Sequence, residues 1–226
     1  MTLLAIIATE RDYSILERHW PYFKMTGWSI LGCGTEDFKT RWPEPVTRLD
    51  TGKVGVIHNA AGSVIFGLVE QELDIWRYLL QHEEYDSVCV VEADNLFVRK
   101  PPQHQGGYMV TLLPNCAGDV FKTSEYFSTP RWADRETAWL LYIHGTAMFR
   151  AGDVEAMVSD RFPAWVCLKH EIPIVPTPNW SPSAQVANEQ EWIRDAQDAI
   201  RRGAYCLHAV KTESQFNALK PMLPCP

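Results

Sequence analysis

Short apolar runs alternate along the chain with helically spaced apolar residues, and this pattern predicts an α/β fold. The uninterrupted apolar run at residues 3–8 predicts a buried first strand, and residues 13–23 predict a helix after it. Residues 28–31, which end at a Gly-Cys-Gly turn, and residues 45–49 predict two further strands. Because strands and helices alternate, we expect a mostly parallel sheet that binds ligands beyond the carboxyl ends of its strands.

The longest helical pattern covers residues 60–81, where apolar residues recur at three- and four-residue spacing opposite acidic ones. It leads directly into a strand at residues 88–91, which are all apolar. The second half of the chain is less regular and is broken by many prolines. Its pattern predicts strands at residues 109–113, 146–149, 172–175 and 204–207, and helices at residues 152–158 and 189–201.

Composition limits the number of domains, the kinds of partner and the cellular compartment that we expect. At 226 residues and 46% hydrophobic content, the chain fits one large α/β domain over residues 1–226. A net charge of −7 argues against nucleic acid or an anionic membrane as the main partner. The six cysteines include no C-x-x-C pair, so neither a zinc cluster nor a redox dithiol is expected. The opening apolar run is too short for a signal peptide or a transmembrane segment, so we expect a cytoplasmic protein.

Two carboxylates, Glu92 and Asp94, follow the buried strand at residues 88–91 and are separated only by Ala93. A strand that ends in acids at this spacing can deliver both side chains to the carboxyl edge of a sheet. Hard divalent cations prefer such oxygen ligands. Acidic residues after a strand also commonly cap a turn or face solvent. Here the chain continues through the apolar residues 96–98 without a Gly, Ser or Asn turn cluster, which favours a functional role.

This arrangement resembles the GT-A class of nucleotide-sugar glycosyltransferases, and especially its small galactosyl and mannosyl transferases. The D-x-D motif of that class is matched by Glu92-Ala93-Asp94, within the phrase VVEADNLFVRKP. The resemblance implies a GT-A-like, Rossmann-like three-layer sandwich with a mostly parallel central sheet. Residues 1–100 would bind the nucleotide and residues 101–226 the acceptor. It also implies Mn²⁺ or Mg²⁺ as cofactor, a nucleoside-diphosphate sugar as donor, and a carbohydrate or other hydroxyl acceptor.

The resemblance assigns roles to four residues around the metal. Asp94 corresponds to the direct metal ligand, and Glu92 to the residue that reaches the ribose, a metal-bound water or the metal itself. Near the C-terminus, His208 and Lys211 match an H-x-x-K element in which the histidine binds the metal and the lysine contacts the diphosphate. A histidine after a strand is also often structural or exposed.

Further donor contacts are expected from other parts of the chain. Thr9 and Arg11 follow the first strand, where this class receives the nucleotide, although Arg11 could equally be a surface residue. Asn59 opens the long helix, either as part of an anion site or as a plain helix cap. His144, Gly145 and Thr146 resemble a later strand at which a small residue admits the donor sugar; the alternative is an ordinary buried strand.

The acceptor side of the site is less determined by the sequence. An inverting transferase needs a carboxylate base beside the acceptor hydroxyl, and by position Asp153 and Glu171 are the first candidates, followed by Glu155 and Asp160. Four tryptophans could stack on an acceptor sugar, although most tryptophans are core residues: Trp132, Trp139, Trp165 and Trp180.

Two other functions fit the same pattern. A nucleotidyltransferase that makes nucleotide sugars shares the scaffold but would favour a glycine-rich phosphate loop after the first strand, and ATERDYS contains no glycine. A non-catalytic nucleotide- or glycan-binding domain is the third possibility, because a fold alone does not specify turnover.

Overall fold

Among the residues that the structure describes, seven strands form the central sheet, six of them running in one direction and one, β9, running against its neighbours. The computed structural model describes residues 1–35, 40–51, 56–59, 62–112, 127–152, 162–181 and 188–225. In spatial order the strands are β10 (Ile174–Thr177), β8 (Tyr108–Leu112), β9 (Phe127–Asp134), β6 (Ser87–Glu92), β1 (Thr2–Ile7), β2 (Ser29–Thr35) and β3 (Thr47–Thr51). The fold is therefore α/β with a mostly parallel sheet, compatible with a Rossmann-like architecture.

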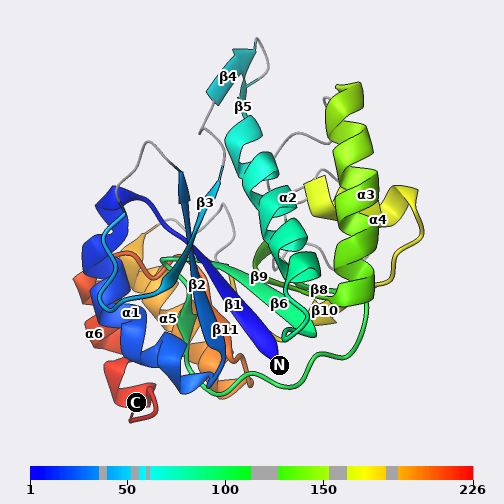
Figure 1. Ribbon diagram of the computed structural model, residues 1–226. Coiled ribbons are helices and arrows are strands. Elements are labelled where there is room, and N and C mark those ends of the chain that lie inside the picture. Colours follow the sequence, from blue (N-terminus) through cyan, green and yellow to red (C-terminus); the bar gives the residue numbers. More distant parts are fainter. Residues whose placement is uncertain are drawn as a thin grey trace.

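Helices cover both faces of this sheet (Figure 1). One layer contains α1 (Tyr13–Met25), α5 (Glu189–Arg201) and α6 (Glu213–Leu219), and the other contains α2 (Phe66–Gln81), α3 (Arg135–Ala151) and α4 (Phe162–Lys169). Along β1, Leu4 and Ile6 pack into the first layer, whereas Leu3 and Ala5 pack into the second. This alternation is the two-residue period of a strand that is buried on both faces. Among the helices of the described ranges, none combines the length and apolar character of a membrane span.

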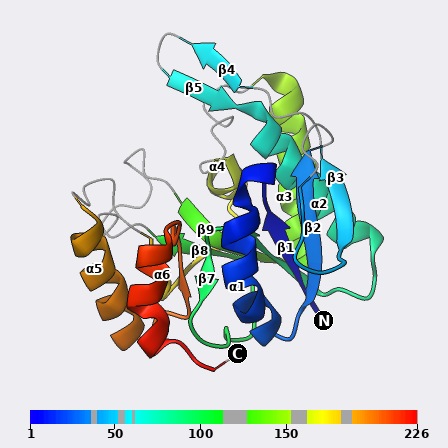
Figure 2. The ribbon, with the colours of Figure 1, turned by 90° about the vertical axis from the view of Figure 1, so that its left-hand side faces the viewer.

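Two short pairs of strands lie outside the central sheet. Strands β4 (Val56–Asn59) and β5 (Gly62–Ile65) form an antiparallel hairpin that extends beyond the amino end of α2 (Figure 2). Strand β7 (Leu96–Phe97) follows the acid pair and is joined by the late strand β11 (Cys206–Leu207). Short 3₁₀ helices at Glu10–Asp12 and Lys220–Met222 complete the described elements. The β7–β11 pairing brings the C-terminal part of the chain to the end of β6.

Most predicted elements are confirmed, with shifts of a few residues at their ends. The long helix differs more, because it begins at Phe66 rather than at residue 60, and residues 62–65 pair with β4 instead. Val64 and Ile65 are β-branched, which favours a strand where a partner strand is available. The predicted helix at residues 152–158 lies almost wholly outside the described residues.

The predicted strand at residues 146–149 is wrong, because these residues lie within the helix α3. Asp134 caps this helix by accepting a hydrogen bond from the Thr137 backbone N–H, and Gly152 ends it with a left-handed φ of 69°. Within the run Thr146–Phe149, Met148 is buried, Ala147 is exposed and the other two residues are half-buried, which is not the alternation of a strand. A short apolar run does not distinguish a strand from a turn of buried helix.

Gly145 is a packing residue of α3. A Cβ atom at this position would lie 2.9 Å from Phe162 Cζ and 3.1 Å from Leu73 Cδ2, so only glycine lets α3 approach its neighbours this closely. We therefore expect Gly145→Val to lower the free energy of unfolding by about 1–3 kcal/mol through overpacking. Urea denaturation measures this change. Ala151→Val, at the exposed end of the same helix, should cost well under half as much; equal losses would contradict the packing role.

Candidate metal site at the carboxyl edge of the sheet

The acid pair lies where two neighbouring parallel strands end. Ile7, the last residue of β1, is the register partner of Glu92, the last residue of β6. The Ala93 N–H donates to the Ile7 carbonyl at 2.9 Å, which fixes the chain as it leaves the sheet. The sequence placed these acids at the carboxyl edge of a buried strand, and the structure confirms that position.

A buried asparagine holds the turn between the acids and β7. Asn95 Oδ1 accepts a hydrogen bond from the Glu92 N–H at 2.7 Å, and the Asn95 N–H donates to the Glu92 carbonyl at 3.0 Å. On its other side, Thr129 Oγ1 donates to Asn95 Oδ1 at 2.8 Å. Asn95 is fully buried, so this network fixes the backbone of the turn that carries both acids. Sequence reasoning missed Asn95, although an asparagine directly after an acid pair is a turn signal.

His208 reaches the acids through the pairing of β11 with β7. Leu207 is the register partner of Leu96, so the residue after β11 lies beside the turn that carries Asp94. The His208 N–H donates to the Trp180 carbonyl at 2.9 Å, and the Val210 N–H donates to the Asp94 carbonyl at 2.9 Å. Backbone hydrogen bonds thus hold the C-terminal element against the acid pair.

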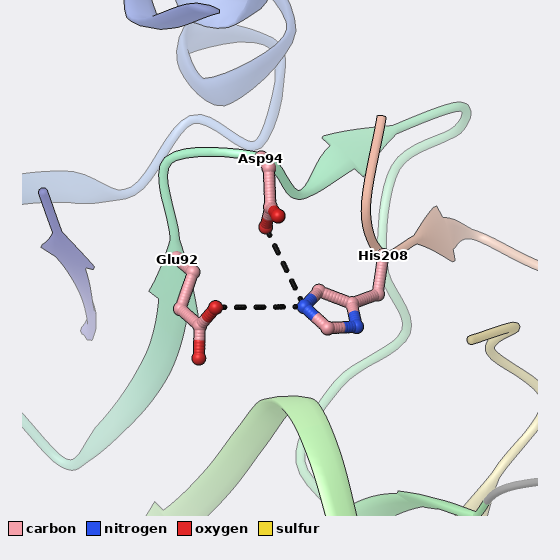
Figure 3. Close-up of side chains that lie close together, drawn as sticks. All are labelled: Glu92, Asp94 and His208. Atoms are coloured by element: carbon pink, nitrogen blue, oxygen red, sulfur yellow. Dashed lines mark ion pairs between the residues drawn. The ribbon is translucent and has the colours of Figure 1, made fainter. Parts of the chain in front are cut away.

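Three side chains converge at this point: Glu92, Asp94 and His208 (Figure 3). His208 Nε2 lies 3.5 Å from Glu92 Oε2 and 3.5 Å from Asp94 Oδ1. One potential ligand atom from each residue lies within 4.8 Å of the others. Asp94 Oδ1 is buried and makes no hydrogen bond within the described structure. A buried carboxylate oxygen without a hydrogen bond is costly unless a cation satisfies it.

Ser181 orients the histidine ring. Its Oγ lies 3.0 Å from His208 Nδ1, the nitrogen that faces away from the acids. When Nδ1 donates to this hydroxyl, Nε2 presents its lone pair towards Glu92 and Asp94. Metal-binding histidines commonly have such a partner on the second ring nitrogen. No sequence signal marked Ser181.

Lys211 extends the site towards solvent. Its Nζ lies 3.4 Å from Asp94 Oδ2, and its side chain is 65% exposed. Its backbone is fixed, because the Lys211 N–H donates to Gln215 Oε1 at 2.8 Å and its carbonyl accepts from Arg18 at 2.9 Å. The mobile end of an anchored lysine can reach an anion that binds beside Asp94.

The pKa values of the three converging residues reflect their coupling. Burial works to raise the pKa of Glu92, but the contact with His208 and its charge outweigh burial and hold this pKa below its usual value. Burial raises the pKa of Asp94, and the Glu92 charge adds to this against the opposing charge of His208. Burial works to lower the pKa of His208, but the two carboxylates outweigh it and raise this pKa. The two carboxylates therefore favour the protonated, positively charged form of His208.

A cleft of about 280 Å³ opens beside this group. Its lining comes from the ends of β1 and β6, the start of α1 and the C-terminal element: Ile7, Ala8, Thr9, Asp12, Ile15, Glu92, Ala93, Asp94 and Lys211. Thr9 and Asp12 are held together, because the Thr9 N–H and Oγ1 donate to Asp12 Oδ2 at 2.7 and 2.9 Å. Thr9 therefore lies at the site as expected, whereas Arg11 is exposed and is not among the lining residues.

The other predicted donor residues lie elsewhere. Asn59 ends β4 in the hairpin and does not cap α2, which starts at Phe66. His144, Gly145 and Thr146 lie on α3; His144 stacks on His170 with ring centroids 3.6 Å apart, and Thr146 lines a groove between α2 and α3. The expectation of an extended strand that admits a sugar at Gly145 is therefore corrected.

Of the four candidates for the catalytic base, the structure describes only Glu171. Asp153, Glu155 and Asp160 lie outside the described residues. Glu171 is exposed in the turn between α4 and β10, with a φ of 56°, and does not line the cleft. Of the four tryptophans, Trp132 is buried in β9, Trp139 is exposed on α3, and Trp165 is half-buried in α4. Trp180 packs on Trp192.

A buried ion pair joins β9 to α2 near the site. Arg131 on β9 contacts Glu72 on α2, and the two side chains are only 3% and 2% exposed. Arg131 is the register partner of Val90, whose side chain points to the same face of β6 as Glu92. The charge of Arg131 also contributes to the lowered pKa of Glu92. Sequence reasoning missed this pair, because its members come from a strand and a helix far apart in the chain.

His19 supports the backbone of the acid pair from α1. This fully buried ring lies with Nδ1 3.0 Å from the Ala93 carbonyl, and burial lowers its pKa from 6.5 to about 4. The unfolded chain therefore binds more protons than the folded chain between these values. Above pH 6.5 His19 is neutral in both states and does not reduce the free energy of unfolding. As the pH falls from 6.5 towards 4, protonation of His19 in the unfolded chain lowers this free energy.

We expect His19 to account for a loss of up to about 3 kcal/mol in the free energy of unfolding across this pH window. Urea denaturation at pH 7, 6, 5 and 4 measures it. His19→Asn keeps a donor near the Nδ1 position but does not titrate, so its stability should depend less steeply on pH. Parallel curves for the two proteins would refute the assignment.

Comparison of the chain with models of known protein families gives no match, and comparison with curated protein sequences gives no significant match. The functional interpretation therefore depends on the geometry of Glu92, Asp94 and His208 and on the cleft beside them.

Proposed function

We propose that this protein is a metal-dependent glycosyltransferase of the GT-A type, which moves a sugar from a nucleoside-diphosphate sugar to a hydroxyl acceptor. The observation that carries the proposal is the convergence of Glu92, Asp94 and His208 at the carboxyl edge of the sheet, with Asp94 Oδ1 buried and not hydrogen-bonded. The acid-x-acid motif and the H-x-x-K element resemble that class. The mostly parallel sheet is compatible with it.

The donor set fits Mn²⁺ or Mg²⁺. Two carboxylates and one imidazole suit Mn²⁺ best, whereas Mg²⁺ would depend more on the carboxylates. When bound, the cation supplies Lewis-acid stabilisation of the charge that develops on a departing diphosphate. Asp94 is the central ligand, because it is the most buried of the three. The contact of Ser181 with Nδ1 orients His208 so that its Nε2 can bind the metal. Glu92 is 39% exposed and is free to bind the metal, a water or a ribose hydroxyl.

The residues around the metal would bind the rest of the donor. Lys211 supplies a flexible positive charge at the mouth of the cleft, as a diphosphate requires. Thr9 lines the same cleft, together with Ile7 and Ala8 at the end of β1, and can contact the nucleoside. Asn95 anchors the backbone of the turn that carries the acids, which reduces the cost of reorganisation when the donor binds.

Lys211→Gln should weaken binding of the nucleoside diphosphate by about 10-fold or more, because a charge-assisted contact is lost. Mn²⁺ affinity should change little, since the lysine is not a ligand. Isothermal titration calorimetry with the nucleotide and with Mn²⁺ separates the two effects. Lys220→Gln, on the exposed Lys220–Met222 turn, is the matched control and should leave both affinities unchanged. An equal loss in both variants would contradict the role of Lys211.

A thermal-shift series tests the proposal as a whole. UDP, GDP, dTDP and CDP are each added with Mn²⁺ and with a chelator, and a matching nucleotide at 100 times its Kd should raise Tm by roughly 5 °C or more only when Mn²⁺ is present. If no nucleotide stabilises the protein in a metal-dependent way, the transferase proposal fails. If one does, slow hydrolysis of the corresponding sugar nucleotide distinguishes an enzyme from a binding domain.

A further inference from the structure

The outer face of α3 carries an exposed apolar stripe. Helix α3 spans 17 residues and lies at the edge of the molecule, beside α2 (Figure 1), and it also packs against α4. Its inner face is buried through Ala138, Leu141, Gly145 and Met148. The opposite face carries five exposed residues at three- and four-residue spacing: Glu136, Trp139, Ile143, Ala147 and Arg150.

This outer stripe is unusual for a helix surface. Trp139 is 52% exposed and Ile143 is 38% exposed, and both belong to the few large hydrophobic side chains that the described surface exposes. Tryptophan is normally among the more buried residues, and contiguous exposed apolar side chains commonly mark an interaction surface. Within the described part of the chain, neither Glu136 nor Arg150 forms an ion pair. The stripe therefore combines apolar surface with two charges that form no ion pair among the described residues; Arg150 also lines the groove between α2 and α3.

The order of residues along the stripe is symmetric about Ile143. Trp139 and Ala147 lie four residues on either side of it, one large and one small. Glu136 and Arg150 lie seven residues on either side, one negative and one positive. Two copies of such a helix, packed antiparallel about a two-fold axis at Ile143, would match large with small and acid with base at every position. An interface around a two-fold axis uses the same patch on both subunits and requires this self-complementarity.

We propose that a second copy of this chain docks on the outer face of α3 to form a homodimer. Ile143 packs against itself at the axis, and Trp139 lies over the partner subunit's Ala147. Glu136 pairs with the partner subunit's Arg150 at both ends. The apolar centre supplies the attraction, and the charges fix the antiparallel direction, because a parallel pairing would place like charges together. The proposal is independent of the metal site, which lies at the carboxyl edge of the sheet.

Sedimentation equilibrium between 1 μM and 1 mM tests the dimer. The wild-type chain should show a reversible monomer–dimer equilibrium, and Trp139→Ser should raise its Kd by at least about 30-fold, as expected for a central aromatic anchor. Glu17→Arg, on the opposite helix layer, should leave the Kd unchanged. A wild-type chain that stays monomeric at 1 mM would overturn the proposal. So would a dimer that Trp139→Ser does not weaken.

Charge reversal tests the antiparallel pairing. Glu136→Arg and Arg150→Glu each place like charges together in a homodimer, so each variant alone should dimerise less than wild type. Mixed in equal amounts, the two variants should form a heterodimer, because one chain is positive at both positions and the other negative. Sedimentation of the mixture at 50 mM salt measures it. If the mixture associates no better than its components, the proposed pairing is wrong.

Discussion

Asp94→Asn is expected to lower the affinity for Mn²⁺ by at least about 100-fold, the largest functional effect that the structure predicts. Loss of an outer-shell partner of a metal ligand already costs 10- to 100-fold in affinity, and Asp94 is the most buried of the three proposed ligands. The amide is nearly isosteric and removes a charge that is costly to bury, so the fold should persist. Isothermal titration calorimetry with Mn²⁺ measures the affinity, and circular dichroism confirms the fold.

Two further variants distinguish a defined Mn²⁺ site from general electrostatic attraction. Glu92→Gln should have a smaller effect than Asp94→Asn, because Glu92 is 39% exposed and its role can be taken by water. Asp12→Asn is the matched control, since Asp12 lines the same cleft but lies outside the group of three. Its Mn²⁺ affinity should stay within about 3-fold of wild type. Equal losses in Asp94→Asn and Asp12→Asn would show general electrostatic attraction rather than a defined site.

Arg131→Met is expected to lower the free energy of unfolding by about 3–5 kcal/mol, the largest effect on stability, because it removes the guanidinium charge that contacts the buried Glu72 carboxylate. Glu72→Leu should be similarly destabilising for the same reason. The double variant carries neither buried charge and should recover most of the loss. Urea denaturation of the four proteins at pH 7 provides the double-mutant cycle. If the loss in the double variant equals the sum of the losses in the two single variants, Arg131 and Glu72 do not stabilise each other, which would contradict the prediction.

The sequence predicted the parts of the site that depend on local pattern. An apolar strand that ends in acids indicates where those acids lie, so Glu92 and Asp94 are found at the edge of the sheet. His208 and Lys211 were predicted from the spacing of a family motif. Their contact with the acids depends on the pairing of β11 with β7, which no local pattern in either strand encodes.

The remaining contributors are determined by tertiary contacts. Ser181 touches His208 because Trp180 bridges to Leu207, and Arg131 meets Glu72 because β9 inserts antiparallel between β6 and β8. The error at residues 146–149 has a similar origin. The packing of Gly145 against Phe162 and Leu73 and the cap at Asp134 specify a helix there, and neither follows from a four-residue apolar run.

The most direct test of the central claim is anomalous diffraction from crystals of the wild-type protein soaked in Mn²⁺. We predict one strong anomalous peak per chain, bounded by Glu92, Asp94 and His208, with His208 Nε2 and an Asp94 oxygen as ligands. The same soak of Asp94→Asn crystals should give no peak at this position. A wild-type map without a peak there, or with its strongest peak elsewhere on the chain, would contradict the proposed metal site and the function inferred from it.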